Sequence, residues 1–258
     1  AWDHINVFPT FPQYVDTFRR FVDTIEPDGT FIYYAGDDNL RAIAAHARPD
    51  ITVMPYEAYD GNVPMQVFGR HNMQNLQAAA LACQAIGVNT NDFYHALSSF
   101  TGASNRLEKI AEVGNSVAYK DFAHSPSKLR ATINAVREHY PDKTLVACME
   151  LHTFSSLMAD FLPQYHGCMQ QADKAFVYFN PKVIEHKHLT PITADEVRQA
   201  FASANVEVFT DSAALQQRLR TLHYDNTALL MMTSGTFDGI DIPALARELL
   251  AGSSEQNK

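Results

Sequence analysis

The chain has 258 residues, with 20 Lys and Arg against 29 Asp and Glu, a formal net charge of −9, and 46% hydrophobic residues. This apolar content excludes an intrinsically disordered chain, and the acidic balance argues against nucleic acid or an anionic membrane as the main partner. No stretch approaches the roughly 18 apolar residues of a membrane-spanning helix. At about 150 residues per domain, the length allows one large domain or two ordinary ones.

The three cysteines and the first residue bear on where the protein works. Cys83, Cys148 and Cys168 are widely spaced in apolar surroundings, which is typical of buried thiols in a reducing compartment. The chain begins with Ala1 rather than Met, without the charged and apolar regions of a signal peptide. We therefore expect a cytoplasmic protein, and a chain that is a piece of a longer one.

Strand and helix patterns alternate over the first hundred residues. Apolar residues recur with a period near 3.6 over residues 14–25, which predicts an amphipathic helix that Pro27 and Gly29 end. A small polar stretch, residues 101–104, is the expected domain junction. Before it we expect strands at 30–35, 51–54 and 64–68 and helices at 40–47 and 72–86.

A second alternating series follows the junction. Short apolar strands separated by longer helical patterns predict a mainly parallel sheet with helices on both faces, and ligands then bind at the carboxyl ends of the strands. The expected strands are 116–120, 144–148, 175–179, 206–209 and 228–232, and the expected helices are 127–139, 161–171, 194–204, 213–222 and 242–250.

The stretch GRHNMQNLQAAA begins at Gly69 and places polar residues at the start of a predicted helix. His71 and Asn75 are four residues apart and share a helix face, with Asn72 beside them. Polar groups at a positive helix end suit a nucleotide base or phosphate. Alternatively, Asn72 caps the helix and Asn75 is solvated, and the spacing alone slightly favours this second interpretation.

The stretch YKDFAHSPSK follows a predicted strand and precedes a helix, so Asp121, His124 and Lys128 are expected at the carboxyl edge of the sheet. A carboxylate there can accept hydrogen bonds from ribose hydroxyls, and a lysine can neutralise phosphate. The other interpretation, equally supported, makes Asp121 a loop residue and Pro126 the first residue of the helix.

Three further features are weaker. Arg106 could reach a phosphate, although a surface pair with Glu108 is the default. The tract EHKH, residues 185–188, resembles a metal tract, but a charged solvated loop is favoured. His152 follows a strand end, a good place for substrate contact, although lone histidines are commonly just packed.

The motifs GRHNMQNLQAAA, NRLE and YKDFAHSPSK, in this order, resemble the Mur ligase superfamily of ATP-dependent amide ligases. The stretch ELHTFS and the ending MTSGTFDGI are most similar to the UDP-N-acetylmuramate ligases, especially the branch that recycles murein tripeptide. The resemblance implies an α/β chain with two parts. Residues 1–102 would be the end of a central ATPase domain, and residues 103–258 a Rossmann-like carboxyl-terminal domain with a mainly parallel sheet.

The resemblance also implies ATP and Mg²⁺ as cofactors. His4 matches a histidine that helps to hold magnesium. No G-x-x-x-x-G-K-[ST] phosphate loop occurs in these 258 residues, so we expect the chain to be inactive alone. The residues that match nucleotide-binding positions of the family are His71, Asn72, Asn75, Arg106 and Asp121.

In the implied reaction, the γ-phosphoryl group of ATP activates a lactyl carboxylate of UDP-N-acetylmuramate as an acyl phosphate, which an amino group then attacks. His124 and Lys128 match the catalytic interdomain site that meets phosphate and the incoming amine. His152 and Ser155 match the part that contacts the substrate. The partners would be UDP-N-acetylmuramate and an amino acid or murein tripeptide, with neither nucleic acid nor membrane involved.

One departure concerns the amine donor. L-alanine-adding relatives read P-H-R-Y-S-R where this chain reads LHTFSS at residues 151–156, so two arginines that suit an amino-acid carboxylate are missing. This favours a peptide donor over L-alanine. Two alternatives stay open: a folylpolyglutamate-type ligase, which shares a similar D-x-A-H-x-P element, and a non-catalytic binding module that uses the nucleotide face.

Overall fold

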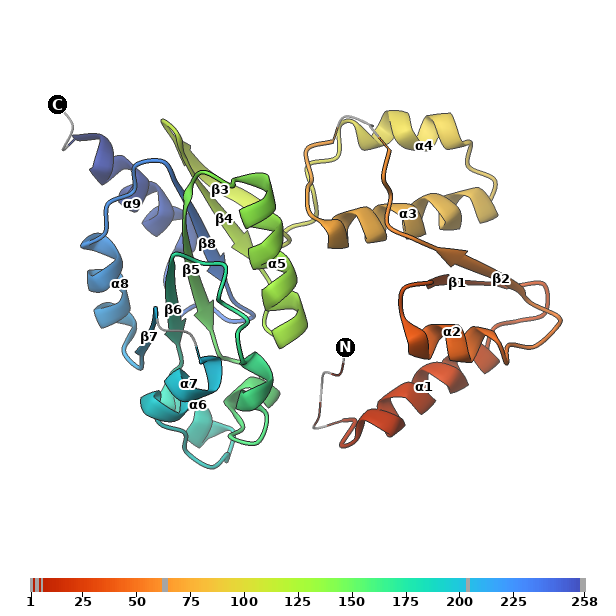
Figure 1. The fold of residues 1–258 in the computed structure, drawn as a ribbon, viewed down its shortest axis with the longest axis horizontal. Helices are drawn as coiled ribbons and strands as arrows, with labels where there is room; N and C mark the ends of the chain where they lie inside the picture. The colour runs from red at the N-terminus through yellow and green to blue at the C-terminus, as the bar shows by residue number, and fades with distance from the viewer. Residues whose placement is uncertain (1, 3–4, 6, 62–64, 203–204, 256–258) are drawn as a thin grey trace. The chain divides into compact units, whose positions relative to one another are not determined.

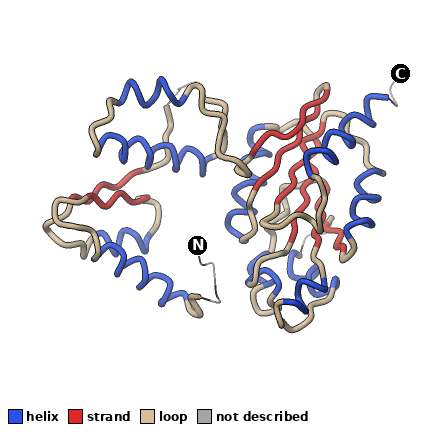
Figure 2. The backbone as a smooth tube through the Cα atoms, turned by 180° about the vertical axis from the view of Figure 1, so that it is seen from behind, coloured by secondary structure: helices blue, strands red, loops and turns tan. Residues whose placement is uncertain are grey.

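The computed structural model describes residues 2, 5, 7–61, 65–202 and 205–255. The chain divides into two compact units, Trp2–Thr101 and Gly102–Lys258, and strands flanked by helices occur in each (Figure 2). Among the helices of the described residues, none combines the length and the apolar character that crossing a membrane requires.

The first unit is built around two parallel strands (Figure 1). Helix α1 starts at Phe11, before the predicted residue 14, because the Thr10 side chain caps it by accepting from the Gln13 amide. The small apolar core has Val22, Ile43 and Ile51 at its centre. The elements are α1 (Phe11–Asp23), β1 (Thr30–Tyr34), α2 (Asp38–Ala44) and β2 (Thr52–Tyr56).

Two helices complete this unit: α3 (Arg70–Ala85) and α4 (Thr90–Leu97). The prediction of α3 is confirmed, whereas α4 was not predicted; the Asn89 side chain caps it by accepting from the Asn91 amide. The predicted strand at 64–68 is wrong over residues 65–68, which are irregular, and Pro64 lies outside the described residues.

The second unit contains a six-stranded sheet in the order β3-β4-β8-β5-β6-β7. All neighbouring strands are parallel except β3, which pairs antiparallel with β4 at the edge and was not predicted. The prediction of a mainly parallel α/β sheet is therefore confirmed. The strands are β3 (Glu108–Val113), β4 (Ser116–Asp121), β5 (Thr144–Glu150), β6 (Lys174–Tyr178), β7 (Val206–Phe209) and β8 (Thr227–Met232).

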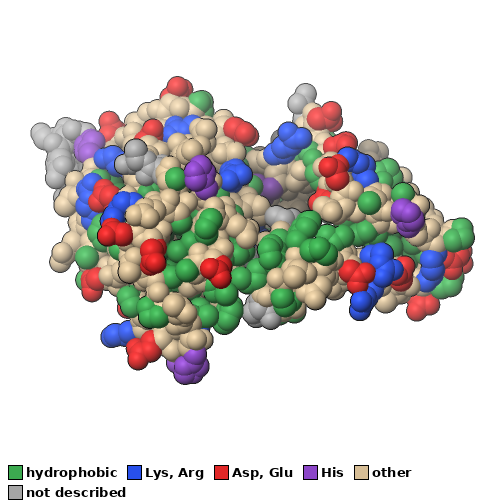
Figure 3. Space-filling model, turned by 60° about the horizontal axis from the view of Figure 1, so that its bottom comes forward, with side chains coloured by type: hydrophobic (Ala, Val, Ile, Leu, Met, Phe, Trp, Pro, Cys, Tyr) green, Lys and Arg blue, Asp and Glu red, His purple; other side chains and the backbone are tan. Residues whose placement is uncertain are grey.

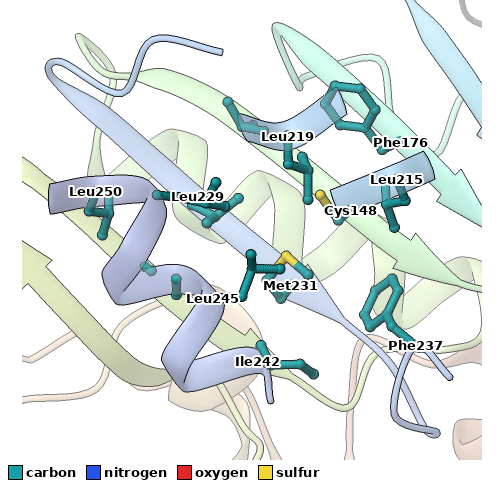
Figure 4. Packing of buried hydrophobic residues seen from close by; sticks show 14 of the residues in the cluster. Cys148, Phe176, Leu215, Leu219, Leu229, Met231, Phe237, Ile242, Leu245 and Leu250 are labelled. Atoms are coloured by element: carbon teal, nitrogen blue, oxygen red, sulfur yellow. The ribbon is translucent and has the colours of Figure 1, made fainter. Parts of the chain in front are cut away.

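Helices α8 and α9 pack apolar side chains onto one face of this sheet (Figure 4). Leu215 and Leu219 of α8 meet Cys148 and Phe176 in the same buried cluster. The helices of this unit are α5 (Pro126–His139), α6 (Pro181–His186), α7 (Ala194–Phe201), α8 (Ser212–Arg220) and α9 (Ile242–Glu255).

Two predictions for the segment around β6 are corrected. The helix predicted at 161–171 is wrong: 3₁₀ helices η1 (Ser155–Leu157) and η2 (Leu162–Tyr165) and turns occupy the region. Pro163 and Gly167, whose φ of 67° is left-handed, interrupt a regular helix there. The prediction that residues 185–188 form a charged loop is wrong for the first two residues, because Glu185 and His186 end helix α6.

Candidate functional site

Three loops leave the carboxyl ends of neighbouring strands in the second unit. Strand β8 lies between β4 and β5, with Met232 paired in register with both Asp121 and Met149. The loops that follow these strands therefore start side by side at the middle of the sheet edge. This is the position where parallel α/β sheets bind ligands.

Asp121 ends β4 and is almost fully buried, with 3% of its surface exposed. Its Oδ1 accepts from the Ala123 amide at 2.7 Å and the Thr132 hydroxyl at 3.1 Å, and its Oδ2 accepts from the Leu107 amide at 2.8 Å. A carboxylate has about four lone-pair sites. Three are thus used to hold the protein together, and one acceptor site is left.

Arg106, Phe122 and His124 form a row at the same edge. The guanidinium carbon of Arg106 lies 5.6 Å from the centre of the Phe122 ring, within range of a cation–π interaction. The rings of Phe122 and His124 meet edge to face with centroids 5.1 Å apart. Arg106 is exposed. Its contact with Phe122 holds it beside the loop that carries His124.

His124 is held from two sides. Its Nδ1 lies 2.8 Å from the Phe122 carbonyl oxygen, and its own carbonyl accepts a 2.5 Å hydrogen bond from the Tyr165 hydroxyl. If Nδ1 carries the proton donated to Phe122, Nε2 is the acceptor of the neutral ring. Helix α5 begins just after, with Pro126 in its first turn and Lys128 half-buried behind it.

Glu150, the last residue of β5, joins the other two loops. Its Oε2 accepts hydrogen bonds from the Thr233 hydroxyl and, at 2.9 Å, from the Phe237 amide. Its Oε1 lies 3.5 Å from Nδ1 of His152, whose side chain is 37% exposed. Glu150 itself is only 3% exposed.

The charge of Glu150 is stabilised despite its burial. Burial alone would raise the pKa of the carboxyl, but hydrogen bonds from His152, Thr233 and the Phe237 amide outweigh burial and leave the pKa below its ordinary value. Glu150 is therefore an ionised group in the interior of the sheet edge.

The other residues expected at the site lie as follows. Ser155 is buried in η1, after the His152 loop. Asn72 does not cap α3, because Gly69 occupies that position; its Nδ2 donates to the Phe68 carbonyl at 2.8 Å. His71 is half-buried and Asn75 is exposed on the same helix.

His4 lies outside the described residues, so its expected role toward magnesium stays a prediction. Within the part of the chain that is described, no group of three or more His, Cys, Asp or Glu side chains could hold a metal ion. The tract at 185–188 thus offers no metal cluster there. On the face drawn in Figure 3, acidic and basic side chains are interspersed.

Residues 105–235, just over half of the chain, match the family model described as Mur ligase, glutamate ligase domain. The chain belongs to the Mur ligase family. The matched range includes Arg106, Asp121, His124, Glu150 and His152.

Curated Mur ligases support the assignment. UDP-N-acetylmuramate–L-alanine ligase from Lactococcus lactis subsp. cremoris strain MG1363 is 27% identical over 228 residues, covering 77% of this chain and 50% of the relative. The same-named protein of Levilactobacillus brevis is 29% identical over 160 residues, covering 59% and 35%. The chain spans about half the length of the curated relatives that it matches.

Solved structures show the same fold. MurF from Acinetobacter baumannii superposes with a TM-score of 0.70 at 15% identity, covering 99% of this chain and 58% of that one. A murein peptide ligase from Psychrobacter arcticus gives a TM-score of 0.62 at 20% identity, covering 93% and 54%.

The sequence motifs contain Phe122 and Glu150, but the sequence alone assigned no role to either residue. Phe122 supports Arg106, and Glu150 gathers Thr233, Gly235 and Phe237 around His152. A glutamate that ends a buried apolar strand was the available signal for the second, because a buried carboxylate requires partners.

Proposed function

We propose that this chain supplies part of an ATP-dependent amide ligase of peptidoglycan synthesis or recycling. The observation that carries the proposal is the family match over residues 105–235, which spans the loops after β4 and β5. In the proposed reaction a carboxylate oxygen of UDP-N-acetylmuramate attacks the γ-phosphorus of ATP. The bond from that phosphorus to the bridging oxygen breaks, so ADP leaves and an acyl phosphate forms. An amine then attacks the acyl carbon, and phosphate leaves as the amide forms.

Arg106 and Asp121 are proposed to bind the nucleotide. When bound, ATP supplies the phosphoryl group that activates the carboxylate. An exposed guanidinium suits an anionic nucleotide, and the remaining lone-pair site of Asp121 suits a ribose hydroxyl. We propose that the base of the nucleotide binds at the start of α3, to His71, Asn72 and Asn75. This helix begins with a glycine cap and has polar side chains in its first turns.

His124 and Lys128 are proposed as the catalytic pair. Two anionic reactants must be brought together in the reaction, so cationic and hydrogen-bonding groups have the largest effect on its rate. Lys128 supplies a positive charge in the first turn of α5. The contact of Nδ1 with the Phe122 carbonyl orients the His124 ring, and the Tyr165 hydroxyl holds the His124 backbone carbonyl. We propose that His4 helps to hold Mg²⁺.

The amine acceptor is proposed to be a murein peptide bound near His152 and Ser155. Relatives named UDP-N-acetylmuramate–L-alanine ligase are similar to the chain. However, residues 151–156 contain no arginine that could clamp an amino-acid carboxylate. We propose that the enzyme works in the cytoplasm, where its three free cysteines stay reduced.

The direct test uses the complete gene product with ATP and UDP-N-acetylmuramate. Tripeptide, L-alanine and L-glutamate are offered separately, L-glutamate also with a folate in place of UDP-N-acetylmuramate, and phosphate release and product mass are measured. We expect amide product and stoichiometric phosphate with tripeptide. A preference for L-alanine contradicts the peptide assignment, glutamate addition to a folate supports the folylpolyglutamate alternative, and failure to hydrolyse ATP with any acceptor supports the binding module.

The chain of 258 residues provides a second test. Because it contains no phosphate-loop motif, we expect its binding of ATP to be weak or undetectable by calorimetry. Micromolar affinity would show that the nucleotide site is misassigned.

A further inference from the structure

The Glu150 carboxylate connects two loops that are far apart in the sequence. It bonds Thr233 and Phe237, which lie 83 and 87 residues away, and it faces His152, which lies two residues later in the loop after β5. The Thr233 hydroxyl, which donates to Glu150, in turn accepts from the Gly235 amide at 2.7 Å. The turn after β8 is therefore folded around this one carboxylate.

Gly235 allows the turn to lie directly against both side chains. A β-carbon at this position would stand 2.8 Å from Glu150 Oε2 and 2.8 Å from His152 Nδ1. Contacts this short do not occur for real side chains, so only glycine fits here without a shift of the pair. The backbone of the turn thus confines the imidazole on the side of Nδ1.

An ionised carboxylate facing one ring nitrogen favours the proton on that nitrogen. Oε2 is already occupied by two donors, so Oε1 is the oxygen that faces Nδ1 of His152. A neutral imidazole carries one proton, and a proton held at Nδ1 leaves a lone pair on Nε2. The side chain is 37% exposed, and Nε2 is the ring nitrogen that does not face the carboxylate.

We propose that Glu150 is a positioning residue that fixes His152 as the Nδ1–H tautomer, so that Nε2 accepts a hydrogen bond from the amine end of the acceptor. This inference rests on the proposed function for the identity of the acceptor, but the tautomer is a property of the chain itself. An accepting Nε2 cannot hold a carboxylate. His152 therefore selects the amine group, in contrast to an arginine, which would select the acid group.

The tautomer is measured by long-range proton–nitrogen correlation on the whole chain labelled with ¹⁵N-histidine, at a pH where the imidazole is neutral. His152→Gln identifies the signal. We expect a pyrrole-type nitrogen at Nδ1 and a pyridine-type nitrogen at Nε2. The Nε2–H tautomer in the unmutated chain would overturn the proposal, and this result needs no folded variant of Glu150.

Glu150→Gln sharpens the test. The amide oxygen is expected to keep the Thr233 and Phe237 bonds, which turns the amide NH₂ toward His152 and reverses the tautomer to Nε2–H. Glu248→Gln, which removes the same charge from an exposed pair with Arg220, is the matched control and leaves the His152 signal unchanged. A folded Glu150→Gln chain with an unchanged tautomer contradicts the proposal.

Kinetics of the complete gene product separate this inference from the proposed function. With Glu150→Gln we expect KM for the amine acceptor to rise about tenfold, as loss of one charge-assisted hydrogen bond implies, with KM for ATP unchanged. An equal rise in both KM values contradicts the positioning role. Absence of ligase activity in the unmutated enzyme would contradict the proposed function while leaving the tautomer result intact.

Discussion

The backbone amide of Leu107 donates a 2.8 Å hydrogen bond to Oδ2 of Asp121, 14 residues later in the chain. Leu107 has a φ of 45°, in the left-handed region that a leucine seldom adopts. The bond to Asp121 therefore holds an unfavourable turn. Since Arg106 directly precedes Leu107, the position of its guanidinium over Phe122 depends on this carboxylate.

Asp121→Asn is expected to destabilise the chain by about 1–3 kcal/mol, because an amide places an NH₂ group against one of three buried donors. Urea unfolding followed by circular dichroism measures the loss. The exposed Asp160→Asn is the matched control and is expected to change stability by less than about 0.5 kcal/mol. An Asp121→Asn chain as stable as the control would contradict the structural role of this carboxylate.

Arg106→Ala tests the nucleotide side of the proposal. Its contact with Phe122 is exposed, so we expect a stability loss of about 0.5–1 kcal/mol, but a roughly tenfold weaker binding of ADP to the complete gene product. Arg106→Lys keeps the charge and loses the planar fork, and is expected to recover only part of the affinity. Calorimetry measures both, with Arg220→Ala as control. Unchanged ADP affinity in Arg106→Ala would remove Arg106 from the site.

The pH dependence of stability should report on Glu150. Its pKa in the folded chain lies below the ordinary value of 4.5, so ionisation favours the folded state. This contribution is complete above the unfolded pKa and is lost as pH falls through the folded pKa. Compared with Glu150→Gln, the unmutated chain should therefore lose stability more steeply below about pH 4.5. Parallel stability curves between pH 6 and pH 3 would contradict the pKa direction.

Gly235→Ala is expected to destabilise the chain by about 1–3 kcal/mol, because the new methyl group meets Glu150 and His152 at contact distances that neither can accept. Thermal unfolding measures the effect. Gly252→Ala is a suitable comparison, since its site in α9 is open and alanine favours a helix, so no loss is expected there. A Gly235→Ala chain that unfolds at the unchanged temperature would show that the turn is not held as described.

Most strands and helices could be predicted from sequence, because each one shows in the pattern of its own residues. Residues 116–120 and 228–232 are short apolar runs, and the structure has them as the neighbouring interior strands β4 and β8. Their position in the sheet and the antiparallel edge strand β3 depend on pairing between distant segments. No local period carries that information. The turns at 161–171 were missed because apolar residues suggested a helix that Pro163 and Gly167 interrupt.

The candidate site divides in the same way. Asp121, His124 and Lys128 stand together in one motif after one strand, so the sequence alone placed them at the sheet edge. The environment of Glu150 involves Thr233 and Phe237, which come from another strand end. Only the insertion of β8 beside β5 brings these residues to His152.

The central claim, that the chain belongs to a ligase working through an acyl phosphate, is tested most directly by oxygen transfer. UDP-N-acetylmuramate carrying ¹⁸O at both oxygens of its lactyl carboxylate is turned over by the complete gene product with ATP and tripeptide, and the released phosphate is analysed by mass spectrometry. We predict one ¹⁸O atom in each phosphate released, because the carboxylate oxygen that attacks phosphorus leaves with it. Amide formation with unlabelled phosphate, or ATP hydrolysis without amide formation, would contradict the claim.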